Sequence, residues 1–316
     1  MKKPLIILTG PTAVGKTKAS IALAKAVGGE IISADSMQVY KYMDIGSAKI
    51  RPEEMQGVKH YLVDVLEPDE EFHVVKFQQM AKEAMNEIYA NGKIPIIVGG
   101  TGFYIQAILN DIDFTENNED SPYRNELELI AKEQGNEILH KMLAEVDPES
   151  ADSIHANNVK RVIRALEFYK QTGQKISDHN EKERAKESPY NFCYFVLNDE
   201  RETLYSRIEL RIDQMMNEGL VEEVRALKER GYTRDMVSMQ GLGYKEILDY
   251  LNGLCTLEEA IYILKRDTRH FAKRQLTWFR RERDVIWIQK NEFHHDEEAI
   301  LNRILQDIRE RMNISC

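Results

Sequence analysis

Cysteine is scarce in this sequence. Cys193, Cys255 and Cys316 are the three cysteines among 316 residues. Their number is odd, they are widely spaced, and no two form a C-x-x-C pair. This pattern argues against a disulfide framework and against a zinc site, and it suits a reducing compartment.

Long apolar runs are absent as well. No stretch approaches the roughly 18 apolar residues that a membrane-spanning helix needs. Residues 1–4 lead directly into the first predicted strand, without a signal-peptide cleavage region. We therefore expect a cytoplasmic protein that has no membrane partner.

Basic residues are in the minority, with 43 Lys and Arg against 53 Asp and Glu and a net charge of −10. This average argues weakly against a nucleic-acid partner, but a polyanion responds to a local patch. Three of the five residues 160–164 are basic, and residues 265–283 hold eight Lys and Arg against two acids. Either segment alone is as consistent with a solvated helix face. Two such segments in an acidic chain favour a bound polyanion.

The strongest motif follows an apolar run at residues 5–8 and precedes an amphipathic helical pattern at residues 18–27. It has the form G-x-x-x-x-G-K-[ST], which is typical of a phosphate-binding loop between a buried strand and a helix. Backbone N–H groups and the helix N-terminus bind the phosphates, a lysine adds a cation, and a hydroxyl can bind Mg²⁺. The motif predicts a pyrophosphate-bearing ligand without saying which. Its residues are Gly10, Pro11, Thr12, Ala13, Val14, Gly15, Lys16 and Thr17.

Two further segments are expected at the same edge of the sheet, because ligands bind at the carboxyl ends of parallel strands. Asp35 follows a strand at 30–33 and could accept a proton from a substrate, bind Mg²⁺ through water, or cap a helix. Thr101 follows a strand at 94–98 and lies in a glycine-rich turn that could approach a ligand or simply connect strand to helix. Arg207 and Arg211, one turn apart on a predicted helix, could close over a transferring group or pair with Glu209 or Asp213.

The alternation of strands and helices predicts an α/β protein: a P-loop NTPase-like parallel sheet flanked by helices, with a helical C-terminal part. We expect further strands at 60–65, 191–197 and 285–288, and helices at 72–91, 257–283, 297–312 and 201–227, the last broken near Gly219. Residues 113–189 read as helical and highly charged. We therefore expect a core of 1–112 and 190–316 that carries a helical insertion at 113–189.

Several segments together resemble the bacterial tRNA dimethylallyltransferases, which isopentenylate adenosine-37 beside the anticodon. The resemblance covers nearly the whole chain in order, at residues 10–17, 32–40, 43–49, 98–104, 161–167, 241–244 and 269–280. The sequence departs in detail from the family at Met37, Gln38 and Gly102, which leaves fine base selectivity open. The plant enzymes that prenylate free adenine nucleotides share the loop but would not need the basic segments.

The resemblance implies a substrate, dimethylallyl diphosphate, and a reaction in which N6 of adenine displaces diphosphate from an allylic carbon. It implies Mg²⁺ at Thr17 and a catalytic set of Lys16, Asp35, Thr101 and Arg211. Asp35 would take the N6 proton, and Thr101 would help orient the diphosphate and the nucleotide. Lys16 and Arg211 would stabilise the departing diphosphate.

The resemblance also implies a second partner, the anticodon stem-loop of tRNA with an A36-A37 context, bound with the insertion as a clamp. A monomer is the default expectation. An ATP-dependent small-molecule kinase and an RNA-binding NTPase switch are the alternatives from other classes of protein. The implied tRNA contacts are Asp35, Ser36, Met37, Gln38, Thr101, Arg124, Lys160, Arg161, Val162, Ile163, Arg164, Gln240, Gly241, Leu242, Gly243, Tyr244 and Lys245.

Overall fold

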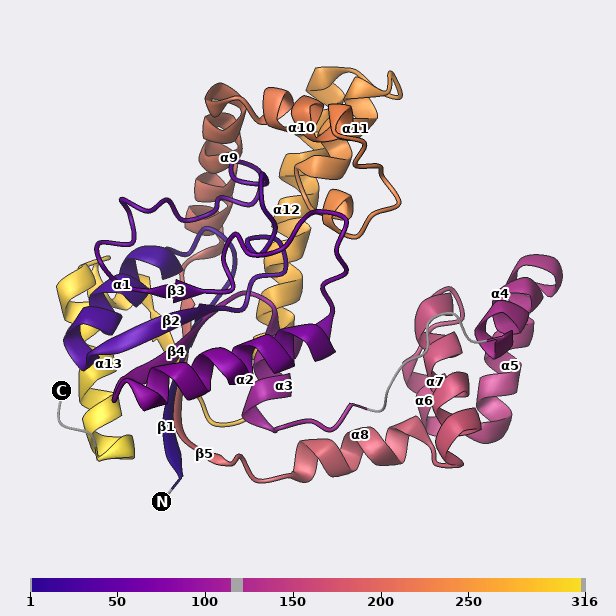
Figure 1. Cartoon of the computed structure of the whole chain (residues 1–316), viewed down its shortest axis with the longest axis horizontal. Helices are drawn as coiled ribbons and strands as arrows, with labels where there is room; N and C mark the ends of the chain where they lie inside the picture. Colours follow the sequence, from indigo (N-terminus) through magenta and orange to yellow (C-terminus); the bar gives the residue numbers. More distant parts are fainter. Residues whose placement is uncertain (1, 115–121, 314–316) are drawn as a thin grey trace. The chain divides into compact units, whose positions relative to one another are not determined.

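The computed structural model of this chain describes residues 2–114 and 122–313, so Cys316 lies outside the described residues. The chain divides into two compact units (Figure 1). Unit 1 comprises Met1–Leu109 and Pro189–Cys316, and unit 2 comprises Asn110–Ser188. The sequence analysis predicted an insertion at 113–189, whose first boundary lies three residues and second boundary one residue beyond those of unit 2.

Unit 1 is built on one parallel sheet, in the order β3-β2-β4-β1-β5-β6 (Figure 1). The phosphate-loop motif follows β1, which pairs with β4 on one side and β5 on the other. The predicted P-loop-like α/β fold is therefore confirmed. In the described residues the strands are β1 (Lys3–Thr9), β2 (Gly29–Ser33), β3 (His60–Tyr61), β4 (Ile94–Gly99), β5 (Tyr190–Asn198) and β6 (Val285–Gln289).

Helices cover both faces of this sheet. Ile6 and Leu8 of β1 pack in a core with α1 and α13, and Leu5 and Ile7 pack in a second core with α2, α3 and α12. A central strand buried on both faces reads as a continuous apolar run, which is why residues 5–8 show no polar alternation. The helices of unit 1 are α1 (Lys16–Val27), α2 (Val74–Ala90), α3 (Gly102–Leu109), α9 (Arg201–Glu218), α10 (Leu220–Glu229), α11 (Tyr244–Leu251), α12 (Leu257–Phe279) and α13 (Glu297–Met312), with 3-10 turns η1 (Ser238–Gln240) and η2 (Lys290–Phe293).

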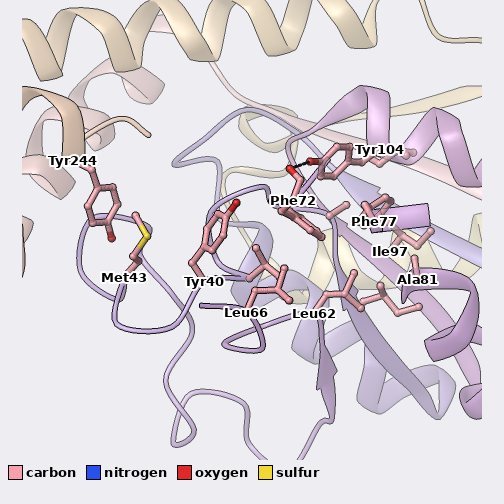
Figure 2. Packing of buried hydrophobic residues seen from close by; sticks show 14 of the residues in the cluster. Tyr40, Met43, Leu62, Leu66, Phe72, Phe77, Ala81, Ile97, Tyr104 and Tyr244 are labelled. Carbon is pink, nitrogen blue, oxygen red and sulfur yellow. Dashed lines mark hydrogen bonds between the residues drawn. The ribbon is translucent and has the colours of Figure 1, made fainter. Parts of the chain in front are cut away.

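An aromatic cluster anchors the segment that follows Asp35 (Figure 2). The rings of Phe77 and Tyr104 stack with centroids 4.5 Å apart. Phe72 meets Tyr104 edge-on at 5.6 Å and Tyr40 edge-on at 6.4 Å. Because Tyr40 is fully buried, the chain between Asp35 and Tyr40 is held at its far end by the core.

Most predicted elements are confirmed, including the helix break at Gly219, where φ is 102° between α9 and α10. The strand predicted at 60–65 is wrong in length, because β3 stops at Tyr61. Leu62 and Asp64 have φ of 60° and 59°, which a strand does not allow. The helix predicted to reach residue 283 ends at Phe279.

Unit 2 is a small helical bundle with its own core. Asp147, almost fully buried, accepts hydrogen bonds from the backbone and hydroxyl of Ser150 and of Ser177, which ties α8 to the start of α6. Leu127, Leu139 and Leu143 pack against α7. In the described residues the helices are α4 (Pro122–Gln134), α5 (Asn136–Val146), α6 (Pro148–Ser153), α7 (Val159–Thr172) and α8 (Ile176–Ala185). No helix among the described residues has the length and hydropathy of a membrane span.

Candidate active site

The phosphate loop at residues 10–17 needs its first glycine for a steric reason. Gly10 has φ of 148°, and a Cβ there would lie 2.4 Å from the backbone oxygen of Leu197 on β5. Gly15 precedes α1 with φ of 95°. Side chains are disfavoured in both conformations, so glycine alone lets the loop curl against the sheet before the helix starts.

Lys16 closes over the loop that carries it. Its Nζ donates to the backbone oxygens of Gly10 and Pro11, each at 2.9 Å. Burial lowers the pKa of Lys16 to about 8, Asp35 raises it in part, and Arg211 lowers it further. The Lys16 ammonium therefore lies over residues 10 and 11 of the loop, where a bound phosphate could replace the two carbonyl oxygens as its partner.

Asp35 lies in the same electrostatic neighbourhood as Lys16 and Arg211. Its Oδ1 accepts hydrogen bonds from the backbone N–H groups of Met37 at 2.8 Å and Gln38 at 3.3 Å. The helix-capping role considered for this carboxylate is not observed, because residues 36–40 form a turn and no helix; the carboxylate caps that turn instead. Among the described residues Oδ2 has no hydrogen-bond partner, so one oxygen orients the group and the other can accept a proton.

Arg207 and Arg211 differ although they are one turn apart on α9. Arg207 binds Asp199, a fully buried carboxylate, at 2.7 Å, and His295 approaches the same carboxylate at 2.9 Å. Arg211 is half-buried, and in the described part of the chain it forms no ion pair. Burial lowers its pKa and Asp35 opposes that shift.

The suggested surface partners of these two arginines are wrong. Glu209 binds Arg269 at 2.7 Å, and Asp213 binds Lys265 at 2.5 Å, so both carboxylates pair with α12. The electrostatic neighbour of Arg211 is Asp35. Of the two arginines, Arg211 is the one available to an anion at the phosphate loop.

The second glycine-rich turn is tied to the other two segments through backbone contacts. Thr9 at the end of β1 donates its hydroxyl to the oxygen of Gly99 at 2.5 Å. The N–H of Thr101 donates to the oxygen of Ala34 at 3.3 Å. Thr101 is half-buried, and its turn is thereby connected both to the phosphate-loop strand and to the residue before Asp35.

The residues 240–245 have a structural task that the sequence did not suggest. Tyr244 is fully buried; its hydroxyl donates to Glu223 at 2.9 Å and accepts the N–H of Ser47 at 3.1 Å. A Cβ at Gly46 would lie 2.6 Å from the Tyr244 ring, and a Cβ at Gly241 would lie 2.4 Å from Met37. This turn therefore positions the 43–49 loop and the residues after Asp35.

Glu223 is a site residue that the sequence analysis missed. Its carboxylate accepts three successive backbone N–H groups, from Asp44 at 2.9 Å, Ile45 at 2.7 Å and Gly46 at 3.1 Å. Gln38 in turn donates to the oxygen of Ala48 at 3.1 Å. A contact chain thus runs from α10 to the neighbour of Asp35, and no local pattern around Glu223 predicts it.

The basic residues of unit 2 divide by exposure. On α7, Lys160 and Arg161 are exposed and Arg164 is half-buried, whereas Val162 and Ile163 lie in the unit's core. The predicted RNA contact by the side chains of Val162 and Ile163 is therefore wrong, because both side chains are buried in the core of unit 2. The α12 segment also divides: in addition to the paired Lys265 and Arg269, Arg266 binds Asp267 at 2.8 Å. The exposed basic residues of segment 265–283 are Arg266, Lys273 and Arg274 on α12 and Arg280, Arg281 and Arg283 after it.

Arg124 forms a bidentate ion pair inside unit 2. Its Nε and a terminal nitrogen donate to Glu167 at 3.1 and 2.7 Å. The Glu167 side chain is 1% exposed, and that of Arg124 is 19% exposed. The charge predicted to contact RNA is therefore already balanced by a buried carboxylate.

The residues at the phosphate loop suit a weakly held divalent ion. Thr17 is exposed on the first turn of α1, and no group of three His, Cys, Asp or Glu side chains among the described residues could hold a metal. Mg²⁺ keeps several waters and is commonly bound by one or two protein groups together with substrate phosphates. One hydroxyl beside a diphosphate fits that mode of binding.

Several known proteins and solved structures are similar to this chain over most of its length. The chain is 64% identical over 98% of its length to a tRNA dimethylallyltransferase of Lachnoclostridium phytofermentans, and it covers 98% of that protein. It is similar to the tRNA isopentenylpyrophosphate transferase of Bacillus halodurans, with 46% identity, 98% coverage of both chains and a TM-score of 0.73. A eukaryotic dimethylallyltransferase acting on tRNA gives 28% identity and a TM-score of 0.81 over 96% of this chain and 80% of that one. The family model described as IPP transferase matches residues 38–282, and this chain therefore belongs to the IPP transferase family.

Proposed function

We propose that this protein transfers a dimethylallyl group from dimethylallyl diphosphate to N6 of adenosine-37 in tRNA. The observation that carries the proposal is the grouping of Lys16, Asp35 and Arg211 at the carboxyl edge of the sheet. Two cations beside a phosphate loop suit a diphosphate, and a carboxylate that interacts electrostatically with both suits proton removal. The phosphate loop by itself does not identify the molecule that accepts the dimethylallyl group. The names of the similar proteins refer to tRNA, which is why we propose tRNA as the acceptor.

The reaction balances with these residues. The lone pair of N6 attacks C1 of the allyl group, the bond from C1 to the diphosphate oxygen breaks, and the N6 proton passes to Asp35 Oδ2. The loop N–H groups, Lys16 and Arg211 stabilise the charge that grows on the leaving diphosphate. Each well-placed donor of this kind contributes about 3–4 kcal/mol to the transition state.

In this proposal Mg²⁺ would be bound by the Thr17 hydroxyl and the diphosphate of the substrate. When bound, it would supply positive charge that neutralises the leaving group. Thr101, connected to the residue before Asp35, would orient the two substrates. None of these residues needs to change its protonation state except Asp35.

Adenosine-37 must leave its stack before N6 can reach the diphosphate, at a cost of a few kcal/mol. We assign this recognition to segments 35–38 and 240–245 of unit 1 and to Lys160, Arg161 and Arg164 of unit 2. Exposed cations suit the phosphate backbone of a stem-loop, which RNA-binding proteins read mainly by shape and splayed bases. The enzyme is expected to act as a monomer in the cytoplasm.

The direct test is transfer of label from dimethylallyl diphosphate to an unmodified anticodon stem-loop that carries A36 and A37, with free AMP as the parallel acceptor. Label on the stem-loop alone is the expected result. Label on AMP would move the protein to the free-nucleotide prenyltransferases. ATP hydrolysis or phosphate transfer without prenylation would contradict the proposed reaction. Only the assignment of residues 10–17 as a phosphate-binding loop would then stand.

A further inference from the structure

Gln275 of α12 joins the two glycine-rich loops of unit 1. Its Oε1 accepts the N–H of Thr12 in the phosphate loop at 2.9 Å. Its Nε2 donates to the oxygen of Gly100 in the second turn at 3.0 Å. The residue is only 6% exposed, so both ends of one buried amide bind backbone groups that are far apart in sequence.

The glycines on either side of Thr101 provide the space for this contact. A Cβ at Gly100 would lie 2.1 Å from the Nε2 of Gln275, and a Cβ at Gly102 would lie 2.2 Å from the indole of Trp278. Gln275 and Trp278 are three residues apart and lie on one face of α12. The sequence suggested that these glycines let a ligand approach, whereas in the structure they accept two side chains of α12.

We propose that Gln275 is a positioning residue for the transfer reaction, fixing the phosphate loop relative to Thr101. This inference rests on the proposed function for its kinetic part. The Thr12 N–H is committed to Gln275, so the diphosphate is held by the remaining donors of the loop, in a place set by α12. Thr101, whose neighbours Gly100 and Gly102 pack against Gln275 and Trp278, is then at a constant position relative to that diphosphate.

The energetic reason for a glutamine is that both of its polar atoms are used. A buried amide that loses one partner keeps the desolvation penalty without the compensating bond. An apolar side chain of similar length removes both bonds at once and leaves the Thr12 N–H and the Gly100 oxygen to find other partners. The distance between the two loops is then no longer specified by α12.

The primary experiment compares Gln275→Met with wild type in steady-state transfer to the stem-loop. A misplacement of reacting groups by about 1 Å costs up to about 100-fold in rate, so we expect kcat to fall about 10- to 100-fold. The Kd of the stem-loop should be unchanged, because Gln275 is buried. Gln306→Met on the exposed surface of α13 is the matched control and should behave as wild type.

A second variant disturbs the contact between Gln275 and Gly100 by changing the glycine. Gly100 has no positive φ, so Gly100→Ala is compatible with its backbone and should push the Gln275 amide away. We expect it to reproduce the kinetic loss of Gln275→Met. If Gln275→Met does not fold, Gly100→Ala carries the test.

The positioning role predicts non-additivity with Thr101. The double variant Gln275→Met with Thr101→Ala should lose little more than the more damaging single variant, because both remove the same orientation. Wild-type kcat in Gln275→Met, fully additive losses, or a parallel loss of stem-loop binding would overturn the inference. Binding of inorganic pyrophosphate needs no acceptor. It therefore distinguishes failure of the proposed function from failure of the positioning role of Gln275. If wild type prenylates no RNA but Gln275→Met binds pyrophosphate with a Kd different from that of wild type, only the proposed function fails. An equal Kd would contradict the inference itself.

Discussion

Arg211 in unit 1 and Arg124 in unit 2 are both partly buried arginines, but only Arg124 forms an ion pair with a carboxylate in the described part of the chain. Arg124 binds Glu167 through two hydrogen bonds. Arg211 interacts with Asp35 only through longer-range electrostatics, and burial lowers the pKa of Arg211. The paired guanidinium of Arg124 stabilises the fold of unit 2. The guanidinium of Arg211, which forms no ion pair among the described residues, is available to bind an anion at the phosphate loop. Arg207, bound to Asp199, shows that unit 1 also uses arginine in the first way.

The first prediction tests the carboxylate beside Arg211. Asp35→Asn keeps an oxygen that can accept the N–H groups of Met37 and Gln38 but cannot take a proton. Loss of a general base costs about 10²–10⁴-fold, so kcat should fall by that amount while stem-loop affinity stays constant. Single-turnover transfer measures the rate, and filter binding measures the affinity. A rate near wild type would remove Asp35 from the chemistry.

The second prediction sets Arg211 against Arg207 on the same helix. Arg211→Met should lower kcat by about 10²–10³-fold, the effect of one lost donor to a developing anion, with little change in Tm. Arg207→Met should mainly lower Tm, because the buried Asp199 loses its guanidinium partner and keeps only His295 among the described contacts. Reversal of these two outcomes would exchange their roles. Transfer kinetics and thermal melts of both variants decide the matter.

The third prediction concerns the arginine of unit 2. Arg124→Met leaves the carboxylate of Glu167 without its bidentate partner, and breaking a buried pair costs about 3–5 kcal/mol. Urea unfolding should show that loss, and Arg124→Met with Glu167→Leu should recover much of it. If the single variant is as stable as wild type but binds the stem-loop more weakly, Arg124 contacts RNA after all.

The fourth prediction uses the pKa of Lys16, which burial lowers to about 8. Only the protonated amine attracts the diphosphate, so kcat/KM for dimethylallyl diphosphate should fall as pH rises above about 8. Above that point the slope is about tenfold per pH unit. Lys16→Arg stays charged, so its profile should be flat from pH 7 to 9.5, at a lower value. The same inflection in both proteins would assign it to another group.

The smallest predicted effect concerns the exposed residues of α7. Each phosphate contact removed should lower the salt slope of stem-loop binding by about one unit or less. Lys160→Glu and Arg161→Glu should show this reduction without a change in Tm. Lys141→Glu on α5, also exposed, is the matched control. An unchanged salt dependence of stem-loop binding would show that Lys160 and Arg161 belong to an ordinary solvated surface and do not contact the RNA.

Much of unit 1 could be predicted because its signals are local. The buried strand at 5–8, the motif at 10–17 and the break at Gly219 each depend on neighbouring residues. The short β3 could not be predicted, because its apolar residues look like a strand while Leu62 and Asp64 adopt positive φ. A helix cap by Asp35 was one of three roles considered, but the segment after it is a turn, in which Oδ1 binds two N–H groups and Oδ2 is left to accept a proton.

The sequence by itself determined the fold class, the phosphate loop and the family resemblance, because short motifs and hydrophobic periodicity reflect local backbone geometry. Only the tertiary structure decided which arginine is paired and which is available. It also brought Gln275 to Thr12 and Gly100, and Glu223 to the 43–49 loop. These contacts join residues separated by 263, 175 and about 178 positions. Such partners are selected by the packing of α10 and α12 around the sheet, and no local pattern encodes them.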